Sequence, residues 1–334
     1  MMENTGKVNP DSMILAGDIG GTNPRLGLFE PARPRPRQRA VQAFATLEFP
    51  DLLSIIAAFL EARSIDRATI DRACFGVAGP VVDDAAQLTH VPWRIEGRAV
   101  AKAFGLKRVR VVNDLIAMAY AVPVLEDSEL HTLQRGEPIR GGNIALVAAG
   151  TGLGIALLHA VEGRIIPSPS EGGHADFAAR TERDIALLRD LTARFGRAEV
   201  EHVVSGKGLV NIYRVAHRGH CAAAIDVGDA DAAAEISKAA LERRCSGCAE
   251  VLEFFVESYG AEAGNLALDM VATGGVYIGG GIAPKILPAL ETGAFLEAFR
   301  AKSSFESMLA KMPVKIILNQ ETGLLGAAVF GADM

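Results

Sequence analysis

The chain has 334 residues, of which 49% are hydrophobic and 22% charged, and its formal net charge is -6. This composition is typical of a globular protein long enough for two domains with cores of their own, and it argues against a nucleic-acid partner. No apolar run approaches the roughly 20 residues that a membrane span needs, and the polar N-terminus up to Ser12 lacks a signal-peptide core. We therefore expect a cytoplasmic protein without a membrane partner.

The first patterned stretch is a glycine turn between two strands. An apolar run over 13–16 leads into Gly17, Asp18, Ile19, Gly20, Gly21, Thr22 and Asn23, and an alternating run follows over 25–29. Alternation predicts strands, so the stretch is a hairpin whose turn offers unobstructed backbone N–H groups and a threonine hydroxyl to an anion. Asp18 beside the turn can hold a hydrated Mg²⁺. The alternative is a turn that only reverses the chain.

The next elements alternate between helix and strand. The basic, proline-rich segment 31–39 predicts a solvated loop, and Asp51 predicts the N-cap of an apolar helix. Strands are predicted over 73–78 and 109–112, the second followed by Asn113, Asp114 and a helix over 115–120. Ligands of α/β sheets gather beyond the carboxyl ends of strands, where this Asn-Asp pair falls. The alternative is that Asp114 merely caps its helix.

The hairpin design returns in the middle of the chain. An apolar strand from residue 143 ends at Gly150, Thr151 and Gly152, and a second apolar strand follows to residue 158. Two such hairpins suggest two domains of like design, each offering a phosphate loop to a shared cleft.

A polar loop follows this second hairpin. Glu171 and His174 have the E-x-x-H spacing of helical metal sites, but the two glycines between them make a helix improbable. A loop that presents a carboxylate and an imidazole suits hydrogen bonds to a polyol, and the alternative is an ordinary surface loop. Thr181 and Asp184 predict a capping box. Glu201 alone predicts a solvated helix residue, and the nearby Gly-Lys pair does not complete a Walker loop.

The last third of the chain is mostly helical. Helices are predicted over 232–244 and 249–270, the second interrupted by Gly260 and Gly264. A strand over 271–278 then runs into Gly279, Gly280 and Gly281, a plausible seat for an adenine ring or ribose, or else a tight turn. Pro284 suits the first turn of a new helix. A strand over 314–318 and a helix over 323–330 follow.

The four cysteines make a weak case for disulfides or metal. Cys245 and Cys248 form a single C-x-x-C, and a structural zinc site needs two more ligands, of which none stands out in the sequence. The seven histidines show no metal-like cluster. We therefore expect reduced thiols near a helix.

Taken together, these motifs resemble the bacterial ATP-dependent glucokinase family of the hexokinase/actin-like superfamily. The matching stretches, in family order, are 17–23, 111–114, 150–154, 170–177, 201–206, 279–282 and 323–326. The resemblance implies an α/β, two-domain actin-like (RNase H-like) ATPase fold with a central inter-domain cleft. It also implies a homodimer that phosphorylates glucose with ATP. The expected domains are residues 1–124, completed by 314–334, and residues 125–313.

The resemblance also implies roles for individual residues. Asp114 matches the catalytic base, and Asp18 is the expected contact of Mg²⁺. The implied sugar-binding residues are Asn113, Gly152, Glu171, His174 and Glu201. The implied ATP-binding residues are Gly17, Asp18, Ile19, Gly20, Gly21, Thr22, Asn23, Gly150, Thr151, Gly280 and Gly281.

Some positions depart from the family pattern. Pro24 follows Asn23 where the family has a small residue, which removes an N–H near the first turn. His90 replaces a common asparagine, and the zinc-binding cysteine cluster of the related repressor-kinase family is absent. Three alternatives stay open: a kinase for mannose, fructose or glucosamine, a sugar-sensing regulator without catalysis, and an actin- or chaperone-like ATPase.

Overall fold

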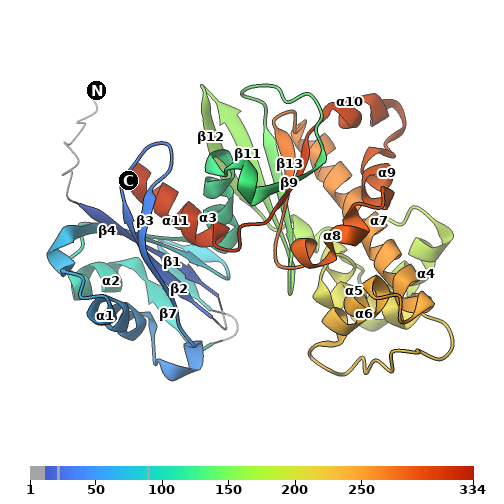
Figure 1. The fold of residues 1–334 in the computed structure, drawn as a ribbon, viewed down its shortest axis with the longest axis horizontal. Helices are drawn as coiled ribbons and strands as arrows, with labels where there is room; N and C mark the ends of the chain where they lie inside the picture. Colours follow the sequence, from blue (N-terminus) through green and yellow to red (C-terminus); the bar gives the residue numbers. More distant parts are fainter. Residues whose placement is uncertain (1–11, 21–22, 89–90) are drawn as a thin grey trace. The chain divides into compact units, whose positions relative to one another are not determined.

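The computed structural model describes residues 12–20, 23–88 and 91–334. The chain forms two compact units, which we call unit 1 (Met1–Leu125 and Gln320–Met334) and unit 2 (Glu126–Asn319). Each unit is built of helices and strands, as the ribbon in Figure 1 shows, so the expected α/β class is confirmed.

Unit 1 is built on a five-stranded sheet with the order β3-β2-β1-β4-β8. β1 pairs antiparallel with β2 and parallel with β4, and β4 pairs parallel with β8. The predicted first hairpin is therefore present. The strands of unit 1 are β1 (Met13–Ile19), β2 (Arg25–Glu30), β3 (Arg37–Ala43), β4 (Ile70–Val77) and β8 (Arg108–Asn113), with a small second sheet of β5 (Val81–Val82), β6 (Ala85–Gln87) and β7 (Arg94–Glu96).

Alternate residues of β1 face opposite layers of helices. Leu15 and Ile19 belong to a core cluster with apolar residues of α1 (Leu52–Ala62) and α2 (Gly97–Phe104). Ile14 and Ala16 belong to another cluster, with residues of α3 (Asp114–Ala121) and α11 (Thr322–Asp333). This alternation is the two-residue period of a strand buried on both faces. Asp51 caps α1 through a hydrogen bond from the Ser54 N–H (2.8 Å), as predicted.

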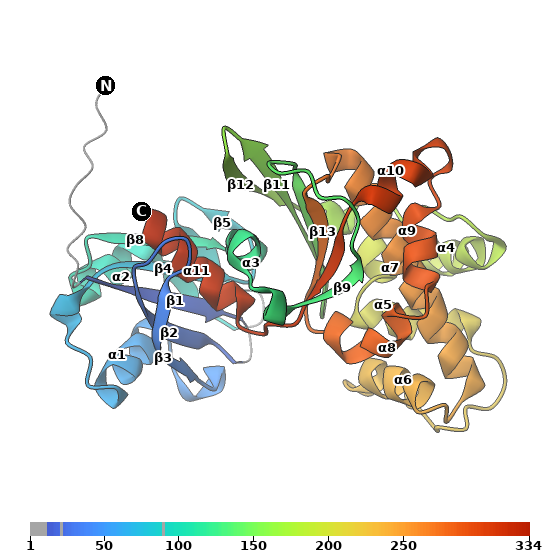
Figure 2. The same ribbon diagram turned by 45° about the horizontal axis from the view of Figure 1, so that its top comes forward.

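The last helix of the chain completes unit 1. Figure 2 shows α11 lying beside β1 and α3. A Cβ at Gly326 would overlap the Ala117 carbonyl, so the two helices pack backbone to backbone. The preceding strand, β14 (Val314–Ile317), pairs with β13 (Gly275–Gly279) and β9 (Leu130–Gln134) and lies in unit 2. We expected the whole segment 314–334 in the first domain.

Unit 2 is built on a six-stranded sheet with the order β12-β11-β10-β13-β14-β9. Its central strands β10 and β13 are parallel, and β10 and β11 form the second predicted hairpin. The strands are β9 (Leu130–Gln134), β10 (Ile144–Ala149), β11 (Leu153–Val161), β12 (Arg164–Ser170), β13 (Gly275–Gly279) and β14. β12 carries Pro167 and Pro169 at the edge of the sheet, where the missing N–H donors are tolerated.

The helices of unit 2 enclose one large core around α7. The α-helices are α4 (Glu182–Phe195), α5 (Gly206–Ala216), α6 (Ala232–Leu241), α7 (Ser246–Met270), α8 (Leu287–Leu290), α9 (Ala294–Arg300) and α10 (Glu306–Lys311). The predicted capping box of α4 is present, since Thr181 accepts the Asp184 N–H and Asp184 accepts the Thr181 N–H. Pro284 lies in the first turn of a 3₁₀ helix, η7 (Ala283–Ile286), which leads into α8.

The predicted interruption of α7 is wrong. α7 runs for 25 residues through Gly260 and Gly264. A side chain at Gly260 would overlap the carbonyl of Phe295, and one at Gly264 would overlap the carbonyl of Phe299. The glycines therefore let α9 approach the backbone of α7, and burial outweighs their low helix propensity. Within the described ranges, every helix is too short or too polar to cross a bilayer.

Candidate active site

In unit 1, three parallel strands end together at one edge of the sheet. Ile19 of β1 is in register with Val77 of β4, and Val77 is in register with Asn113 of β8. Neighbouring strands lie about 4.8 Å apart, so Asp18 and Asn113 occupy strand ends separated by about 10 Å. The edge therefore carries the first glycine turn and the Asn-Asp pair, as the sequence predicted for the carboxyl ends of strands.

Asn113 and Asp114 have different tasks at this edge. Asn113 is the N-cap of α3, and its side-chain oxygen accepts the N–H groups of Leu115 (2.9 Å) and Ile116 (3.4 Å). Its amide nitrogen donates to the Gly79 carbonyl (3.3 Å), which ties the cap to the end of β4. The interpretation of Asp114 as the helix cap is therefore wrong, because Asn113 has that role.

Asp114 is a half-buried carboxyl group with a raised pKa of about 6. Burial is the main cause, because it disfavours the charged form, and the Asp18 carboxylate raises the pKa further. The Leu115 N–H, which donates to Asp114 at 2.9 Å, acts in the opposite direction. A carboxyl group tuned in this way can take up a proton near neutral pH.

Asp18 offers a half-buried carboxyl oxygen at the end of β1. Burial raises its pKa, and the charge of Arg25 on β2 lowers it. A Cβ at Gly323, in the first turn of α11, would lie 3.1 Å from the Asp18 carboxylate. In the described part of the chain no salt bridge reaches this carboxylate. An unpaired hard oxygen donor of this kind fits a hydrated Mg²⁺.

Only part of the first turn belongs to the described residues. Gly21, Thr22 and the departure at His90 lie outside the described residues. Gly17, Asp18 and Ile19 belong to β1, Gly20 follows it, and Asn23 and Pro24 lead into β2. The Pro24 carbonyl accepts the Phe44 N–H (2.9 Å), which anchors the start of β2.

In unit 2, the second glycine turn is held against Glu201. Gly150 donates its N–H to the Gly152 carbonyl (2.8 Å), and the Gly150 carbonyl accepts the Gly206 N–H (2.9 Å) at the start of α5. The Glu201 carboxylate accepts the Leu153 N–H (2.8 Å) and leaves no room for a side chain at Gly152. Thr151 at the tip of the turn is exposed. Glu201 is thus a partly buried residue of a 3₁₀ turn, η6 (Val200–His202), and not the solvated helix residue that the sequence predicted in isolation.

The polar loop after β12 lies beside η6. The Ala175 carbonyl accepts the Val200 N–H (2.9 Å), and the Phe177 N–H donates to the Ala198 carbonyl (3.0 Å). The loop forms a single 3₁₀ turn, η5 (Gly172–His174), which agrees with the prediction that no longer helix forms. The structure therefore brings Glu171, His174 and Glu201 into one neighbourhood.

His174 is surrounded by carboxylates. Its Nδ1 lies 2.8 Å from an oxygen of Glu199, a residue that the sequence analysis did not single out. This hydrogen bond is the main cause of a raised His174 pKa, and the charges of Glu201, Glu199 and Glu171 add to it. The other ring nitrogen, Nε2, has no recorded hydrogen bond within the described residues. His174 and Glu171 are exposed, so both can contact a ligand.

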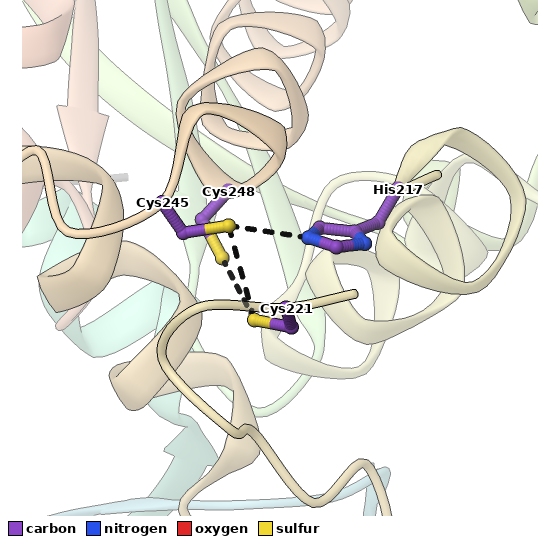
Figure 3. Close-up of side chains that lie close together, drawn as sticks. All are labelled: His217, Cys221, Cys245 and Cys248. Carbon is purple, nitrogen blue, oxygen red and sulfur yellow. Dashed lines mark hydrogen bonds between the residues drawn. The ribbon is translucent and has the colours of Figure 1, made fainter. Parts of the chain in front are cut away.

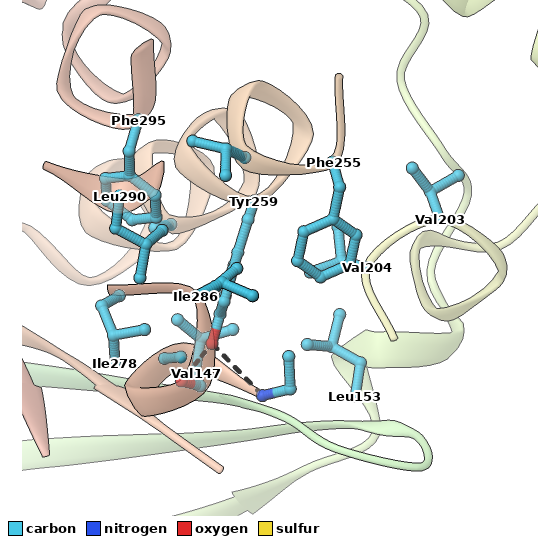
Figure 4. Packing of buried hydrophobic residues seen from close by; sticks show 14 of the residues in the cluster. Val147, Leu153, Val203, Val204, Phe255, Tyr259, Ile278, Ile286, Leu290 and Phe295 are labelled. Carbon is cyan, nitrogen blue, oxygen red and sulfur yellow. Dashed lines mark hydrogen bonds between the residues drawn. The ribbon is translucent and has the colours of Figure 1, made fainter. Parts of the chain in front are cut away.

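Tyr259 connects the strand ends that carry the glycine turns of unit 2. From α7, its hydroxyl donates toward the Val147 carbonyl (3.3 Å) and accepts the Ala149 N–H (3.2 Å). It also lies 3.4 Å from the Gly279 carbonyl of β13. Figure 4 shows the ring among the buried side chains of the core, with the hydroxyl reaching β10. The only sequence signal was a tyrosine on the apolar face of a helix, which we did not recognise as a support for the turns.

The third glycine turn lies next to the second. Gly280 has a φ of +82°, and a Cβ there would overlap the Ala149 carbonyl, so only glycine fits. The Ile282 N–H donates to the same carbonyl (3.2 Å). The turn at 279–281 is therefore held against the end of β10, directly before Gly150.

A cavity of about 1050 Å³ opens beside these turns, entirely within unit 2. Its wall includes Gly150 and Thr151, the basic side chains of Lys207 and Lys285, and the apolar side chain of Ile286. Such a mixture suits a flat apolar group that carries anionic phosphates. The sequence analysis expected a nucleoside near 279–281, and it did not predict that α5 and α6 line a cavity beside that turn.

Comparison with known proteins matches nearly all of the chain to one group. A family model described as Glucokinase matches residues 15–334. The glucokinase of Nostoc punctiforme is 38% identical over 342 residues, covering 97% of this chain and all of that protein. A crystal structure of glucokinase from an Antarctic psychrotroph has a TM-score of 0.86 at 30% identity, covering 97% of this chain and 99% of that one. A ROK family glucokinase from Streptomyces griseus, solved with glucose and AMPPNP, shares the fold at a TM-score of 0.62 and 20% identity, covering 97% and 100%.

Proposed function

Because this chain belongs to the glucokinase family and has its actin-like ATPase fold, we propose that it transfers the terminal phosphoryl group of ATP to the 6-hydroxyl group of glucose. The observation that best supports this reaction is the edge of the unit 1 sheet. There a carboxyl group tuned toward neutral pH stands two strands away from a glycine turn. In phosphoryl transfer, the protein mainly positions the reacting groups and stabilises the charge on the phosphates.

Asp114 is the proposed catalytic base. Its carboxylate accepts the proton of the sugar 6-hydroxyl as the oxygen attacks phosphorus. A loose transition state requires only a modest base, and a pKa of about 6 leaves the group mostly ionised at neutral pH. Asn113 orients the start of α3 and binds the sugar beside it.

The glycine turns are the proposed phosphate-binding groups. Residues 20–23, which follow β1, and Thr151 donate backbone N–H groups to ATP, and Thr22 and Thr151 add hydroxyl groups. Asp18 is the proposed contact of Mg²⁺, through water. When bound, Mg²⁺ neutralises charge on the phosphates. Gly280 and Gly281 receive the nucleoside end of ATP beside the cavity of unit 2.

The sugar hydroxyl groups are bound by Asn113 together with Gly152, Glu171, His174 and Glu201. Glu201 accepts the Leu153 N–H with one oxygen, so its other oxygen is available to a sugar hydroxyl. The Nδ1 of His174 is hydrogen-bonded to Glu199, so its Nε2 is the ring nitrogen that binds a sugar hydroxyl. A hydrogen bond to a charged group contributes roughly 1.5–3 kcal/mol, so few residues suffice to select one hexose.

Further properties belong to the same proposal. The two compact units correspond to the two domains of the kinase, with the C-terminal helix returning to the first. The protein works in the cytoplasm as a homodimer. Size-exclusion chromatography with light scattering tests the dimer, and a monomer at micromolar concentration contradicts it.

The decisive experiment measures ADP release in the presence of ATP and Mg²⁺ with glucose, mannose, fructose or glucosamine. We expect turnover with glucose to exceed that with the other sugars, and Asp114→Asn to lower kcat by orders of magnitude while glucose binding persists in calorimetry. A preference for another hexose assigns the protein to a different sugar. ATP hydrolysis that is indifferent to every sugar contradicts a sugar kinase.

A further inference from the structure

A cluster of sulfur and nitrogen atoms lies in unit 2 outside the proposed active site. His217, Cys221, Cys245 and Cys248 each direct one ligand atom to a common point, and these atoms all lie within 4.8 Å of one another. Figure 3 shows the imidazole and the three sulfur atoms turned toward each other. The prediction that no further ligands accompany the C-x-x-C is therefore wrong, because the fold brings His217 and Cys221 to it.

From this geometry we propose that the chain binds one structural zinc ion with His217, Cys221, Cys245 and Cys248 as its ligands. This proposal is independent of the proposed enzymatic function.

The distances agree with a tetrahedral zinc site. With Zn–S bonds of about 2.3 Å and Zn–N bonds of about 2.0–2.1 Å, tetrahedral angles place two sulfurs about 3.8 Å apart and a sulfur and a nitrogen about 3.5 Å apart. In the structure, the Cys221 sulfur lies 3.9 Å from the sulfurs of both Cys245 and Cys248. His217 Nε2 lies 3.2 Å from the Cys245 sulfur. The ligand atoms thus need only small shifts to bind a central ion.

The ligand spacing is that of a zinc site assembled from two pairs. His217 and Cys221 are separated by three residues, and Cys245 and Cys248 by two. The first pair follows α5, and the second begins α7, where Cys245 is the N-cap residue. Paired ligands at such spacings are usual in structural zinc sites.

The surroundings favour a closed site with thiolate ligands. Cys245 is 7% exposed and Cys248 is 0% exposed. Tyr213 stacks on His217, with the ring centroids 4.5 Å apart, and fixes the orientation of the imidazole. Four protein ligands leave no open position for substrate, so the ion has a structural role.

Gly247 makes room for the histidine ligand. A Cβ at this position would lie 2.6 Å from His217 Nε2, the nitrogen that points to the sulfurs. The small residue inside the C-x-x-C therefore allows the imidazole to approach. It also supplies a test that leaves all four ligands in place.

A disulfide is the competing explanation for neighbouring cysteines. An S–S bond is about 2.05 Å long, so two sulfurs that are 3.9 Å apart must approach by nearly 2 Å. A disulfide also gives no role to the third cysteine and the histidine. The cluster of four ligands is better explained by a metal.

The first experiment measures metal content. The full chain is produced in zinc-supplemented medium, purified with a reductant and without a chelator, and analysed by inductively coupled plasma mass spectrometry. We expect one zinc per chain, falling at least about tenfold in Cys221→Ser and in His217→Asn. The matched control is Cys74→Ser, which removes a buried cysteine of unit 1 and should keep its zinc. Wild-type protein without zinc, or equal zinc in Cys221→Ser, overturns the proposal.

The second experiment uses wild-type protein and does not depend on the folding of a ligand variant. Cobalt replaces zinc, and we expect the intense visible bands of tetrahedral Co²⁺ with a thiolate-to-cobalt charge-transfer band, both lost on adding Zn²⁺. Gly247→Ala should weaken cobalt binding at least about tenfold. An octahedral cobalt spectrum contradicts the site. A disulfide would also contradict the site. It would be detected if two thiols resist alkylation in denaturant without reductant.

Discussion

The side-chain oxygen of Asn113 caps helix α3 by accepting the Leu115 N–H, whereas the carboxyl group of the next residue, Asp114, has a raised pKa. Of these two adjacent residues, Asn113 therefore stabilises the helix, and Asp114 is the proposed catalytic base. We predict that Asn113→Ala lowers the free energy of unfolding by about 1 kcal/mol, because it removes the cap. Urea denaturation measures this change. An exposed control, Ser64→Gly, should lie within about 0.5 kcal/mol of wild type, since it relieves a positive φ of 51°.

Ionisation of Asp114 makes the folded state less stable as the pH rises. Its pKa is about 6 when folded, against an ordinary value of 3.8, so the folded protein binds more protons than the unfolded chain between these values. Stability must therefore fall as the pH rises through this window. At pH 8, Asp114→Asn should be more stable than wild type by up to about 3 kcal/mol, since one pKa unit corresponds to about 1.4 kcal/mol.

The measurement is thermal or urea unfolding of Asp114→Asn and wild type at pH 4 and pH 8. The advantage of the variant should shrink toward zero at pH 4, where the aspartic acid is neutral in the folded protein. Glu61→Gln, an exposed control on α1, should stay within about 0.5 kcal/mol at both values. Equal effects of Asp114→Asn at the two pH values contradict the raised pKa.

Tyr259→Phe should loosen the glycine turns of unit 2 without opening the core. The ring is retained, but the buried Ala149 N–H loses its acceptor, at a cost of about 1–3 kcal/mol in unfolding free energy. Because this N–H directly precedes Gly150, we also expect a higher KM for ATP with a smaller change in the KM for glucose. Tyr277→Phe on β13 is the control. If stability falls but the KM for ATP is unchanged, Tyr259 stabilises the core and does not support ATP binding.

Gly260→Ala should be strongly destabilising although alanine favours helices. Its methyl group collides with the Phe295 carbonyl, so α9 must shift, at a cost of about 1–3 kcal/mol. Differential scanning calorimetry of the variant measures the loss. Gly97→Ala at the start of α2 is the matched control, because its nearest neighbour would be at an ordinary 3.4 Å. Stabilisation by Gly260→Ala would show that propensity, and not packing, decides at this position.

Sequence patterns predicted the elements correctly where nearby residues alone decide the backbone conformation, as in helix caps and alternating strands. Asp51, the pair Thr181 and Asp184, and the alternating strands of both hairpins lie where the sequence placed them. Those signals depend on neighbours in the chain. The continuous helix through Gly260 was mispredicted because its reason, the carbonyl of Phe295, comes from another helix.

The candidate site shows the same division. The glycine turns and the Asn-Asp pair were found because they lie at strand ends that alternation marks. Glu199 and Tyr259 were missed, since each acts through a partner distant in the chain, His174 and Ala149 respectively. The cysteine cluster was missed for the same reason, because 23 residues separate Cys221 from Cys245.

The return of α11 to unit 1 has a consequence for synthesis on the ribosome. β1 and its neighbours emerge first, yet the apolar face formed by Ile14 and Ala16 is covered by Leu324 and Ala328, which are translated last. Unit 2 is complete before that cover exists. The nascent chain must therefore carry an open hydrophobic surface on its earliest strands through most of translation, and chaperone binding during synthesis should concentrate there.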